Sequence, residues 1–345
     1  MLTMARQISA LWQNPTVRVG TALAAAAVVA LGTLLFIRER ADESVAPIFK
    51  QWSLELSADP LSVAQVETAF AEINYDFARV KQGLHPVPRV LVRSVPEDLG
   101  QVPEVTRRKS LFLGSVLPLV LAVNEQIMAE RRALEDIAGK IRARQPLSDA
   151  DIAEVNRLAK IYRLGGDAEE TVADVSDTAL LDELLLRVAP MPVSMALAQA
   201  AEESAWGLSR FASEGNALYG QWVWNDKAGM VPTARGSDET HSVRAFRDIL
   251  ESTLSYAHNL NTHWAYEDFR KMRANMLNSS GRLDGAALAG TLTRYSGRGQ
   301  AYVESLRGII RSNGLAALDQ ARFAAPALQS AGVRTADAGL AVGAM

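Results

Sequence analysis

Two adjacent carboxylates, Glu202 and Glu203, interrupt an otherwise small and apolar stretch, MPVSMALAQAAEESAWGLSRFA, which starts at Met191. Its spacing predicts a helix over residues 195–207, with Ser194 as the N-cap. Consecutive helical residues point about 100° apart, so the two acids have different surroundings and cannot share one role. Spacing alone does not say which of them faces a substrate.

Glu203 lies four residues after Gln199 and three before Trp206, hence on the same face of the predicted helix. A carboxyl group beside an indole and small apolar side chains is partly desolvated, which disfavours its charged form and raises its pKa. A carboxyl group that is still protonated near neutral pH can donate a proton to a leaving glycosidic oxygen. The alternative from residue types alone is a solvent-facing acidic pair on an ordinary helix.

The segment ALAQAAEESAWGLSRFASEGNALYGQW resembles the signature of the bacterial peptidoglycan glucosaminidases of glycoside hydrolase family 73, AQxxxESGWGxS followed by NNLFG. The chain is most similar to the Bax-type branch, related to the flagellar rod-cap hydrolase, through RRKSLFLGSVLPLVLAVNEQIMAERRAL and NLNTHWAYEDFR as well. The resemblance spans about residues 107–314. It implies a mainly α, lysozyme-like helical domain with a small β-hairpin lobe. It also implies that the catalytic acid is the Glu before Ser-x-Trp-Gly, which is Glu203.

Two positions depart from the family pattern. Ala205 replaces the Gly of the ESGWG block, and Ala217 replaces the second Asn, which removes one side-chain hydrogen bond. Neither change removes the acid. The sugar-binding residues that we predict are Trp206, Asn216, Tyr219 (in place of the usual Phe) and Trp222.

A second carboxylate is expected from the small lobe, whose strands are predicted at QWVW and SVRAF. We favour Glu239 over Asp238 and Asp226 as base or stabiliser. Alternatively, the N-acetyl group of the substrate takes part directly, and the second carboxylate then matters less.

Aromatic residues supply the remaining site predictions. The resemblance places Tyr295, in LTRYSGRGQAYVESLRGII, near the acid, where it would position the sugar; the alternative is an aromatic ring wedged between helices. Trp222 and Trp224 could stack on the apolar faces of sugar rings. Residues two apart on a strand share a face, but if the strand bends only one of them faces the cleft, and we favour Trp222.

The elements that position these residues are mostly predicted helices. Residues 41–175 form a helical N-terminal region, with helices over 61–82 and 107–144 and a proline-rich extended piece between them. The long helix carries a heptad-like seam, which indicates either packing within the chain or a coiled coil that binds an envelope protein. Residues 176–318 form the glucosaminidase domain, and the Ala/Gly-rich residues 319–345 a disordered tail.

The N-terminal segment predicts membrane attachment. After a short cytoplasmic tail, residues 1–18, the uncharged run 19–37 is about 28 Å long as a helix, close to the hydrocarbon thickness of a bilayer. We favour an uncleaved anchor over a cleaved signal peptide or a buried helix. The mild excess of basic residues before the run places the N-terminus in the cytoplasm and the catalytic domain in the periplasm, as a single-pass bacterial inner-membrane protein.

Composition excludes several classes of function. The 345 residues carry a formal net charge of -3 and only 6% aromatic residues, so we expect no nucleic-acid partner. The absence of cysteine excludes disulfides, thiolate metal sites and cysteine nucleophiles. The four histidines fit no metal-binding spacing, so we expect no metal and no cofactor.

The sequence therefore predicts a hydrolase that cuts the β-1,4 bond after N-acetylglucosamine in peptidoglycan glycan strands. Two alternatives stay open: a lytic transglycosylase that uses a single Glu, and an inactive protein that binds peptidoglycan or envelope machinery.

Overall fold

Helix α5 (Val105–Arg142) lies at the centre of the computed structural model, which describes residues 52–164, 175, 177–223, 229–230, 242–325 and 334–335. From Leu111 to Val123 every residue of α5 is buried. Pro118 lies inside this stretch and has no N–H for the carbonyl of Gly114, one turn earlier. The hydroxyl of buried Tyr75 donates to that carbonyl at 3.0 Å, so the proline leaves no buried acceptor unpaired.

The N-terminal elements pack on one side of α5. Strands β1 (Leu54–Leu56) and β2 (Val90–Val92) are parallel, and β6 (Arg334–Thr335) pairs with the other edge of β1. The extended prediction for the proline-rich segment is thus confirmed by β2. The single helix predicted over 61–82 is wrong: it is two helices, α3 (Val63–Glu72) and α4 (Phe77–Lys81). Between them Asn74 takes a left-handed backbone conformation, which ends α3.

The seam of α5 is covered by the chain's own helices. Its C-terminal half packs against α6 (Asp149–Ile161) and α7 (Thr178–Arg187). The polar seam residues bind the end of α7 and its connection to α8: Asn124 exchanges two hydrogen bonds with the backbone of Met191, and Arg131 donates to the carbonyls of Leu185 and Val188. The heptad-like pattern therefore reflects packing within the chain.

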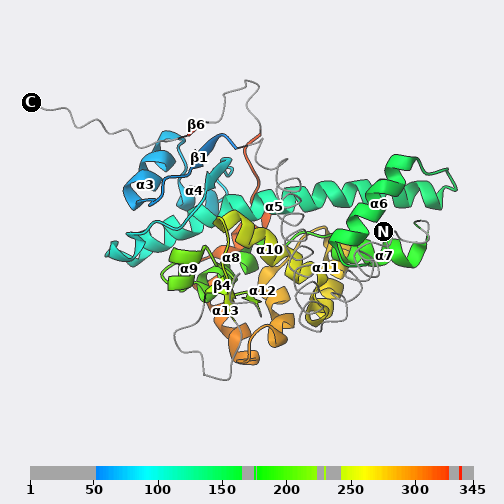
Figure 1. The fold of residues 1–345 in the computed structure, drawn as a ribbon. Helices are drawn as coiled ribbons and strands as arrows, with labels where there is room; N and C mark the ends of the chain where they lie inside the picture. Colours follow the sequence, from blue (N-terminus) through cyan, green and yellow to red (C-terminus); the bar gives the residue numbers. More distant parts are fainter. Residues whose placement is uncertain are drawn as a thin grey trace, which may run out of the picture. The chain divides into compact units, whose positions relative to one another are not determined.

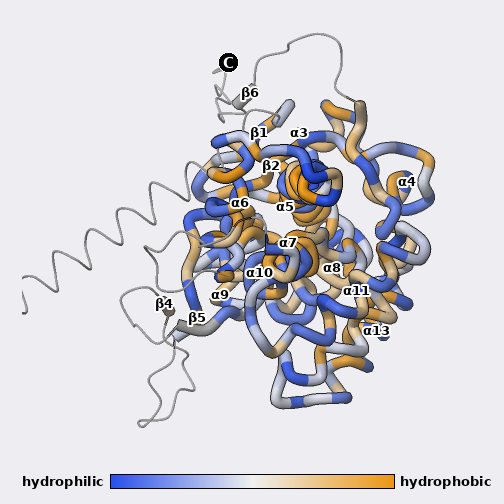
Figure 2. The backbone as a smooth tube through the Cα atoms, turned by 90° about the vertical axis from the view of Figure 1, so that its right-hand side faces the viewer, coloured by the Kyte–Doolittle hydropathy of each residue, from blue (hydrophilic) through white to orange (hydrophobic). Residues whose placement is uncertain are grey.

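The remaining described elements lie mostly on the other side of α5, as Figures 1 and 2 both show for α8 and α13 against α3 and β1. They are α8 (Val193–Glu203), α9 (Arg210–Gly215), α10 (Ile249–Thr262), η3 (Trp264–Tyr266), α11 (Glu267–Ser280), α12 (Gly285–Leu288), η4 (Ala289–Arg294), α13 (Gln300–Ser312) and η5 (Leu315–Gln320), with η1 (Leu99–Gln101) before α5. The predicted mainly α fold is confirmed.

A small antiparallel sheet forms the predicted β lobe. Its strand order is β3 (Trp222–Val223), β5 (Ser242–Arg244), β4 (Gly229–Met230), and Trp222 pairs with Val243. Both predicted strands are present; β4 is an additional one.

The start of α8 is held from far along the chain. The helix begins at Val193 with Pro192 as its N-cap, so the prediction of Ser194 as N-cap is wrong. Instead the carboxylate of Asp319 accepts from the backbone N–H and the hydroxyl of Ser194, at 2.7 and 2.8 Å, and from Gly285 N–H at 3.0 Å. This capping places Asp319 inside the folded unit. The predicted disordered tail over 319–345 therefore starts too early, because residues up to 325 and strand β6 are ordered.

No boundary separates the predicted N-terminal region from the hydrolase domain, because residues 52 onward form one unit in which α5 packs directly on α8 and α10. In the described part of the chain, α5 alone is long and apolar enough to cross a bilayer by length and composition, and 78% of its most apolar window is buried inside the protein. Figure 2 shows hydrophobic residues gathered along α5 and its neighbours. The predicted anchor over 19–37 lies outside the described residues.

Candidate active site

Glu203 is the last residue of α8, and the Ser-x-Trp-Gly residues that follow form a tight turn. The hydroxyl of buried Ser204 donates to the carbonyl of Ala200 and accepts from the N–H of Gly207 at 2.8 Å. Ala205, Trp206 and Gly207 are all left-handed, with φ of 51°, 63° and 81°. This explains the Gly that the family pattern carries at position 205, since Ala pays about 1–2 kcal/mol in this conformation.

The turn directs Trp206 away from the face that the sequence predicted. The helix ends at Glu203 rather than at Gly207, so a spacing of three no longer puts the acid and the indole side by side. The indole packs edge-on against Phe112 of α5, at 6.2 Å between ring centroids, and the ammonium of Lys109 lies 4.1 Å from its centre. Trp206 therefore anchors the turn to α5.

The two adjacent glutamates have different partners. Glu202 accepts from the guanidinium of Arg298 at 2.6 Å and from the hydroxyl of Ser305 at 2.9 Å, so it forms an ion pair with the loop before α13. Glu203 instead accepts from the neutral hydroxyl of Tyr302 at 2.7 Å. Burial raises the pKa of Glu203 and the charge of Glu202 adds to this, whereas the Tyr302 hydrogen bond and Arg298 oppose it. The net shift of the pKa is upward, as a general acid requires.

A buried chain of hydrogen bonds leads to the acid. The hydroxyl of Tyr256 donates to the side-chain carbonyl of Gln199, whose amide donates to Tyr302 at 2.9 Å; Tyr302 then donates to Glu203 Oε1. Tyr256 and Gln199 are fully buried, and Tyr302 is 1% exposed. Every donor in this chain has one acceptor, so the orientation of the Glu203 carboxyl group is fixed from inside the protein.

We expect Tyr302→Phe to shift the pH dependence of activity. The hydrogen bond from Tyr302 stabilises the carboxylate and lowers its pKa, so its loss raises the pKa of Glu203. As the predicted general acid, Glu203 would work only when protonated, so activity should fall as pH rises through its pKa. The alkaline limb of the profile should therefore move to higher pH, with a loss of kcat below about tenfold. An unchanged alkaline limb in kcat against pH would contradict this coupling.

Gly220 leaves the second oxygen of the acid uncovered. A Cβ at this position would lie 3.1 Å from Glu203 Oε2, and the backbone of Gly220 is left-handed with φ of 60°. When Tyr302 donates to Oε1, an acidic proton must sit on Oε2, the oxygen that faces Gly220. The glycine thus keeps side-chain atoms away from the oxygen that would carry the proton.

Gly220→Ala should impair both stability and activity. The left-handed backbone costs Ala about 1–2 kcal/mol of folding free energy. The new methyl group must also displace the carboxyl of Glu203, the predicted general acid, and a small misplacement of such a group should lower kcat by about tenfold or more. Thermal unfolding and kcat measured on the same sample separate the two effects. The idea fails if the variant is destabilised but fully active.

Tyr219 and Tyr295 support the acid from behind. Tyr219 is 1% exposed and stacks on Tyr256 at 3.9 Å between ring centroids, so in this structure it lies under the site and not on a sugar-binding surface. Tyr295 donates from its hydroxyl to the backbone carbonyl of Tyr219 at 3.0 Å and stacks on Tyr302 at 5.5 Å. The predicted Tyr295 is thus one ring away from the acid, and Tyr302, seven residues later, makes the direct contact. Sequence reasoning missed Tyr302, although its position on the apolar face of α13 was visible.

Asn216 joins α9 to the β lobe. It is the left-handed C-cap of α9, and its amide donates to the carbonyls of Phe246 and Arg247 at 3.2 and 3.1 Å. The following Ala217 is 1% exposed and packs with Val243 and Phe246. The departure from the second Asn of the family pattern is therefore accommodated by an apolar contact.

Several predicted site residues lie outside the described residues. These are Glu239, Asp238, Asp226 and Trp224; for Trp222 the structure gives the backbone of β3 alone. Within the described part of the chain, no group of three or more His, Asp or Glu side chains is placed to hold a metal ion. His258 contacts the carbonyl of Ile161 at 2.7 Å, and His263 accepts from Ala265 N–H at 3.3 Å.

Part of the chain is similar in sequence to known proteins. Residues 183–315 match the glucosaminidase family, described as mannosyl-glycoprotein endo-β-N-acetylglucosaminidase, and the match contains Glu203, Gly220 and Tyr302. The chain is 32% identical over 218 residues to Protein bax of Escherichia coli strain K12, which covers 63% of this chain and 73% of that protein. No solved structure matches. The chain belongs to the glucosaminidase family.

Proposed function

We propose that the protein is an endo-β-N-acetylglucosaminidase that hydrolyses the β-1,4 bond after N-acetylglucosamine in peptidoglycan, with Glu203 as the general acid. The observation that carries this proposal is the environment of Glu203. Its carboxyl group is largely buried, its pKa is raised, and the hydroxyl of Tyr302 holds it, while the adjacent Glu202 takes the nearby Arg298. A shielded acid next to a paired carboxylate can stay protonated near neutral pH.

The proposed reaction uses the two oxygens of Glu203 differently. Oε1 accepts the hydrogen bond from Tyr302, so the acidic proton lies on Oε2 beside Gly220. Oε2 donates this proton to the glycosidic oxygen as the bond to the anomeric carbon breaks, and an oxocarbenium-like state develops. The carboxylate that remains is stabilised by the Tyr302 hydroxyl.

A second group must stabilise that state or activate water. Glu239 of the β lobe is our candidate, and an inverting mechanism would need it about 6.5–9.5 Å from Glu203. The N-acetyl group of the substrate is the alternative. Glu202 is a poorer candidate, because its two oxygens already accept from Arg298 and Ser305. A Glu239→Gln variant that keeps full activity would favour substrate assistance.

Product analysis tests the proposal. The full-length protein in detergent is incubated with purified cell-wall sacculi and, separately, with a glycoprotein that carries mannosyl glycans, the substrate in the family description. We expect soluble fragments from sacculi with N-acetylglucosamine at the reducing end. Anhydro ends would instead identify a lytic transglycosylase. Sacculus binding without any cleavage would identify an inactive binding protein, and cleavage of the glycoprotein alone would move the substrate away from peptidoglycan.

We further propose that residues 19–37 anchor the chain in the bacterial inner membrane with residues 52–335 in the periplasm. The uncharged length of the segment supports an anchor, and a cell-wall substrate supports the periplasmic side. The protein should then stay with membranes after a high-salt wash and be digested by protease added to spheroplasts. Release by salt, or protection from the protease, would contradict this arrangement.

A further inference from the structure

We propose that Trp264 is a sugar-stacking platform that binds the glycan strand away from the bond being cut. This inference rests on the proposed function, since it assigns part of the substrate to a second place on the protein. Trp264 belongs to the NLNTHWAYEDFR segment, to which the site described above gives no role. It is the first residue of η3, directly after α10.

Trp264 is exposed to an unusual degree. Its exposed fraction is 70%, the highest among the large hydrophobic residues in the described part of the chain. A tryptophan normally buries most of its large apolar ring. An indole that is held out to solvent on a folded surface is therefore a candidate contact for a ligand.

A row of rings connects this surface to the acid. Tyr302, which donates a hydrogen bond to Glu203, stacks on Tyr295 with 5.5 Å between the ring centroids. The ring centroids of Tyr295 and Tyr266 are 5.8 Å apart. Tyr266 lies 5.6 Å from the ring of His263, which lies 5.4 Å from Trp264. Tyr302 and Tyr266 are buried, whereas Tyr295 and His263 are partly exposed and Trp264 is open. The platform is thus built on the same packed layer that positions the acid.

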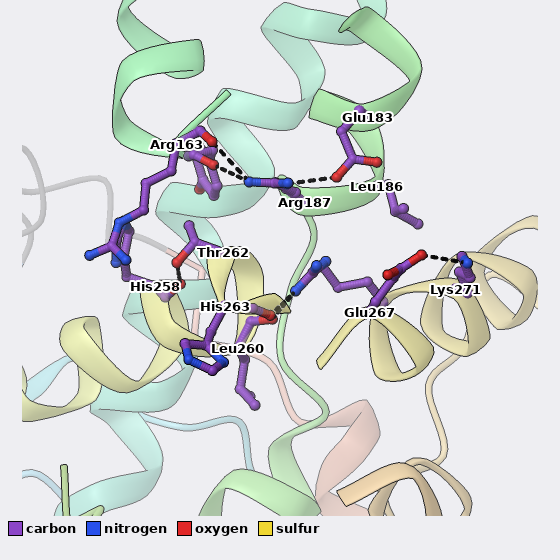
Figure 3. A network of polar contacts seen from close by, with 12 residues as sticks. Arg163, Glu183, Leu186, Arg187, His258, Leu260, Thr262, His263, Glu267 and Lys271 are labelled. Atoms are coloured by element: carbon purple, nitrogen blue, oxygen red, sulfur yellow. Dashed lines mark hydrogen bonds and ion pairs between the residues drawn. The ribbon is translucent and has the colours of Figure 1, made fainter. Parts of the chain in front are cut away.

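The backbone that carries Trp264 is fixed by polar contacts. The buried guanidinium of Arg270 donates to the carbonyls of Leu260 and His263, at 3.1 and 2.8 Å, on either side of the end of α10. The ring of His263 caps η3 by accepting from Ala265 N–H. Figure 3 shows His263 and Leu260 in this network, close to the ion pair of Glu267 with Lys271. A platform that is already ordered loses little entropy on binding.

The chemistry of the platform suits a sugar ring. The faces of a pyranose carry C–H groups and its rim carries hydroxyls, so it can cover an indole and keep its polar groups in water. Burial, together with the charges of Arg163 and Arg270, lowers the pKa of the neighbouring His263, which favours the uncharged ring beside the platform. A long neutral glycan is therefore the expected occupant.

Binding and turnover of Trp264→Ala test the proposal, with Leu84→Ala as the matched control because Leu84 is also exposed, at 60%, and lies outside the row of rings. Both changes are made in a Glu203→Gln background for sacculus pelleting. Losing one aromatic stacking partner should weaken binding by about tenfold. Trp264→Phe should restore most of it, and Leu84→Ala should leave it unchanged.

In the active protein, Trp264→Ala should lower kcat/KM on long glycan strands by about tenfold and leave the shortest cleaved oligosaccharide unaffected. Equal losses on long and short substrates would overturn the proposal, because Trp264 would then only support the acid. The proposal would also be overturned if Trp264→Ala bound and cleaved sacculi as well as Leu84→Ala does. That result would be expected if Trp264 contacts another protein and not the glycan. The proposed function has a separate test, because it fails if the unaltered protein releases no fragments from sacculi. The pelleting experiment would then still show whether Trp264 contributes to sacculus binding.

Discussion

Glu203→Gln is expected to lower kcat on sacculi by roughly 10²–10⁴-fold, the usual contribution of a general acid. Gln has the same shape, and its carbonyl oxygen can still accept from Tyr302, so the chain of hydrogen bonds through Gln199 stays intact. The proton that the leaving oxygen needs is lost. Reducing-end release from labelled sacculi measures the effect, with circular dichroism as the check on folding.

The matched control is Glu202→Gln, one residue away on the same helix. It breaks the ion pair with Arg298 but leaves the proposed acid in place. Removing the charge of Glu202 lowers the pKa of Glu203, because that charge contributes to raising it. Activity should stay within a few-fold at acidic pH, and its alkaline limb should move to lower pH. If Glu202→Gln inactivates the protein while Glu203→Gln does not, the assignment of the acid is wrong.

Glu203→Gln should not destabilise the protein, although it should remove most of the activity. A carboxyl group whose pKa is raised by folding contributes stability below its unfolded pKa, and this contribution is lost as pH rises through the folded pKa. At pH 7, which lies above the unfolded pKa, the raised pKa of Glu203 therefore opposes folding, because the group must either bury its charge or take up a proton, and Gln avoids both costs. Glu203→Gln should melt at the same temperature as the unaltered protein or higher at pH 7, as is common for residues kept for function.

The sequence predicted the elements whose signals are local. The apolar spacing over 107–144 predicted α5, which the structure shows over Val105–Arg142. The strands of the β lobe followed from alternation and turn residues. These features depend on neighbours within a few residues, which a single sequence displays.

What the sequence could not give depends on distant contacts. The start of α8 is capped by Asp319, 125 residues after Ser194, so no local pattern reveals it. The helix ends at Glu203 because the hydroxyl of Ser204 accepts a hydrogen bond from Gly207 N–H and the residues between them have a left-handed backbone. As a result Trp206 packs on α5 and not beside the acid. Tyr302 then replaced the indole as the partner of the acid. The family signature predicted Glu203 as the acid, but the residues that surround it became known only from the fold.

Arg273→Lys is expected to lower the free energy of unfolding by about 2–4 kcal/mol, which is large for a substitution that keeps the charge. Arg273 of α11 is fully buried and donates to five acceptors. They are the carbonyls of Leu186, Arg187, Ala189 and Pro190 and the side-chain oxygen of Asn261. A lysine has three donors on one atom and cannot span both ends of this segment, so buried carbonyls stay unpaired.

The segment that Arg273 holds leads from the end of α7 directly into α8, so the loss should reach the acid as well. The midpoint of thermal unfolding should fall by about 3–7 °C, and kcat should fall with little change in KM. Arg282→Lys, on an exposed residue just after α11, is the matched control and should change stability by less than about 0.5 kcal/mol. Equal stability of the two lysine variants would show that the carbonyls find water instead, and that the path into α8 does not depend on Arg273.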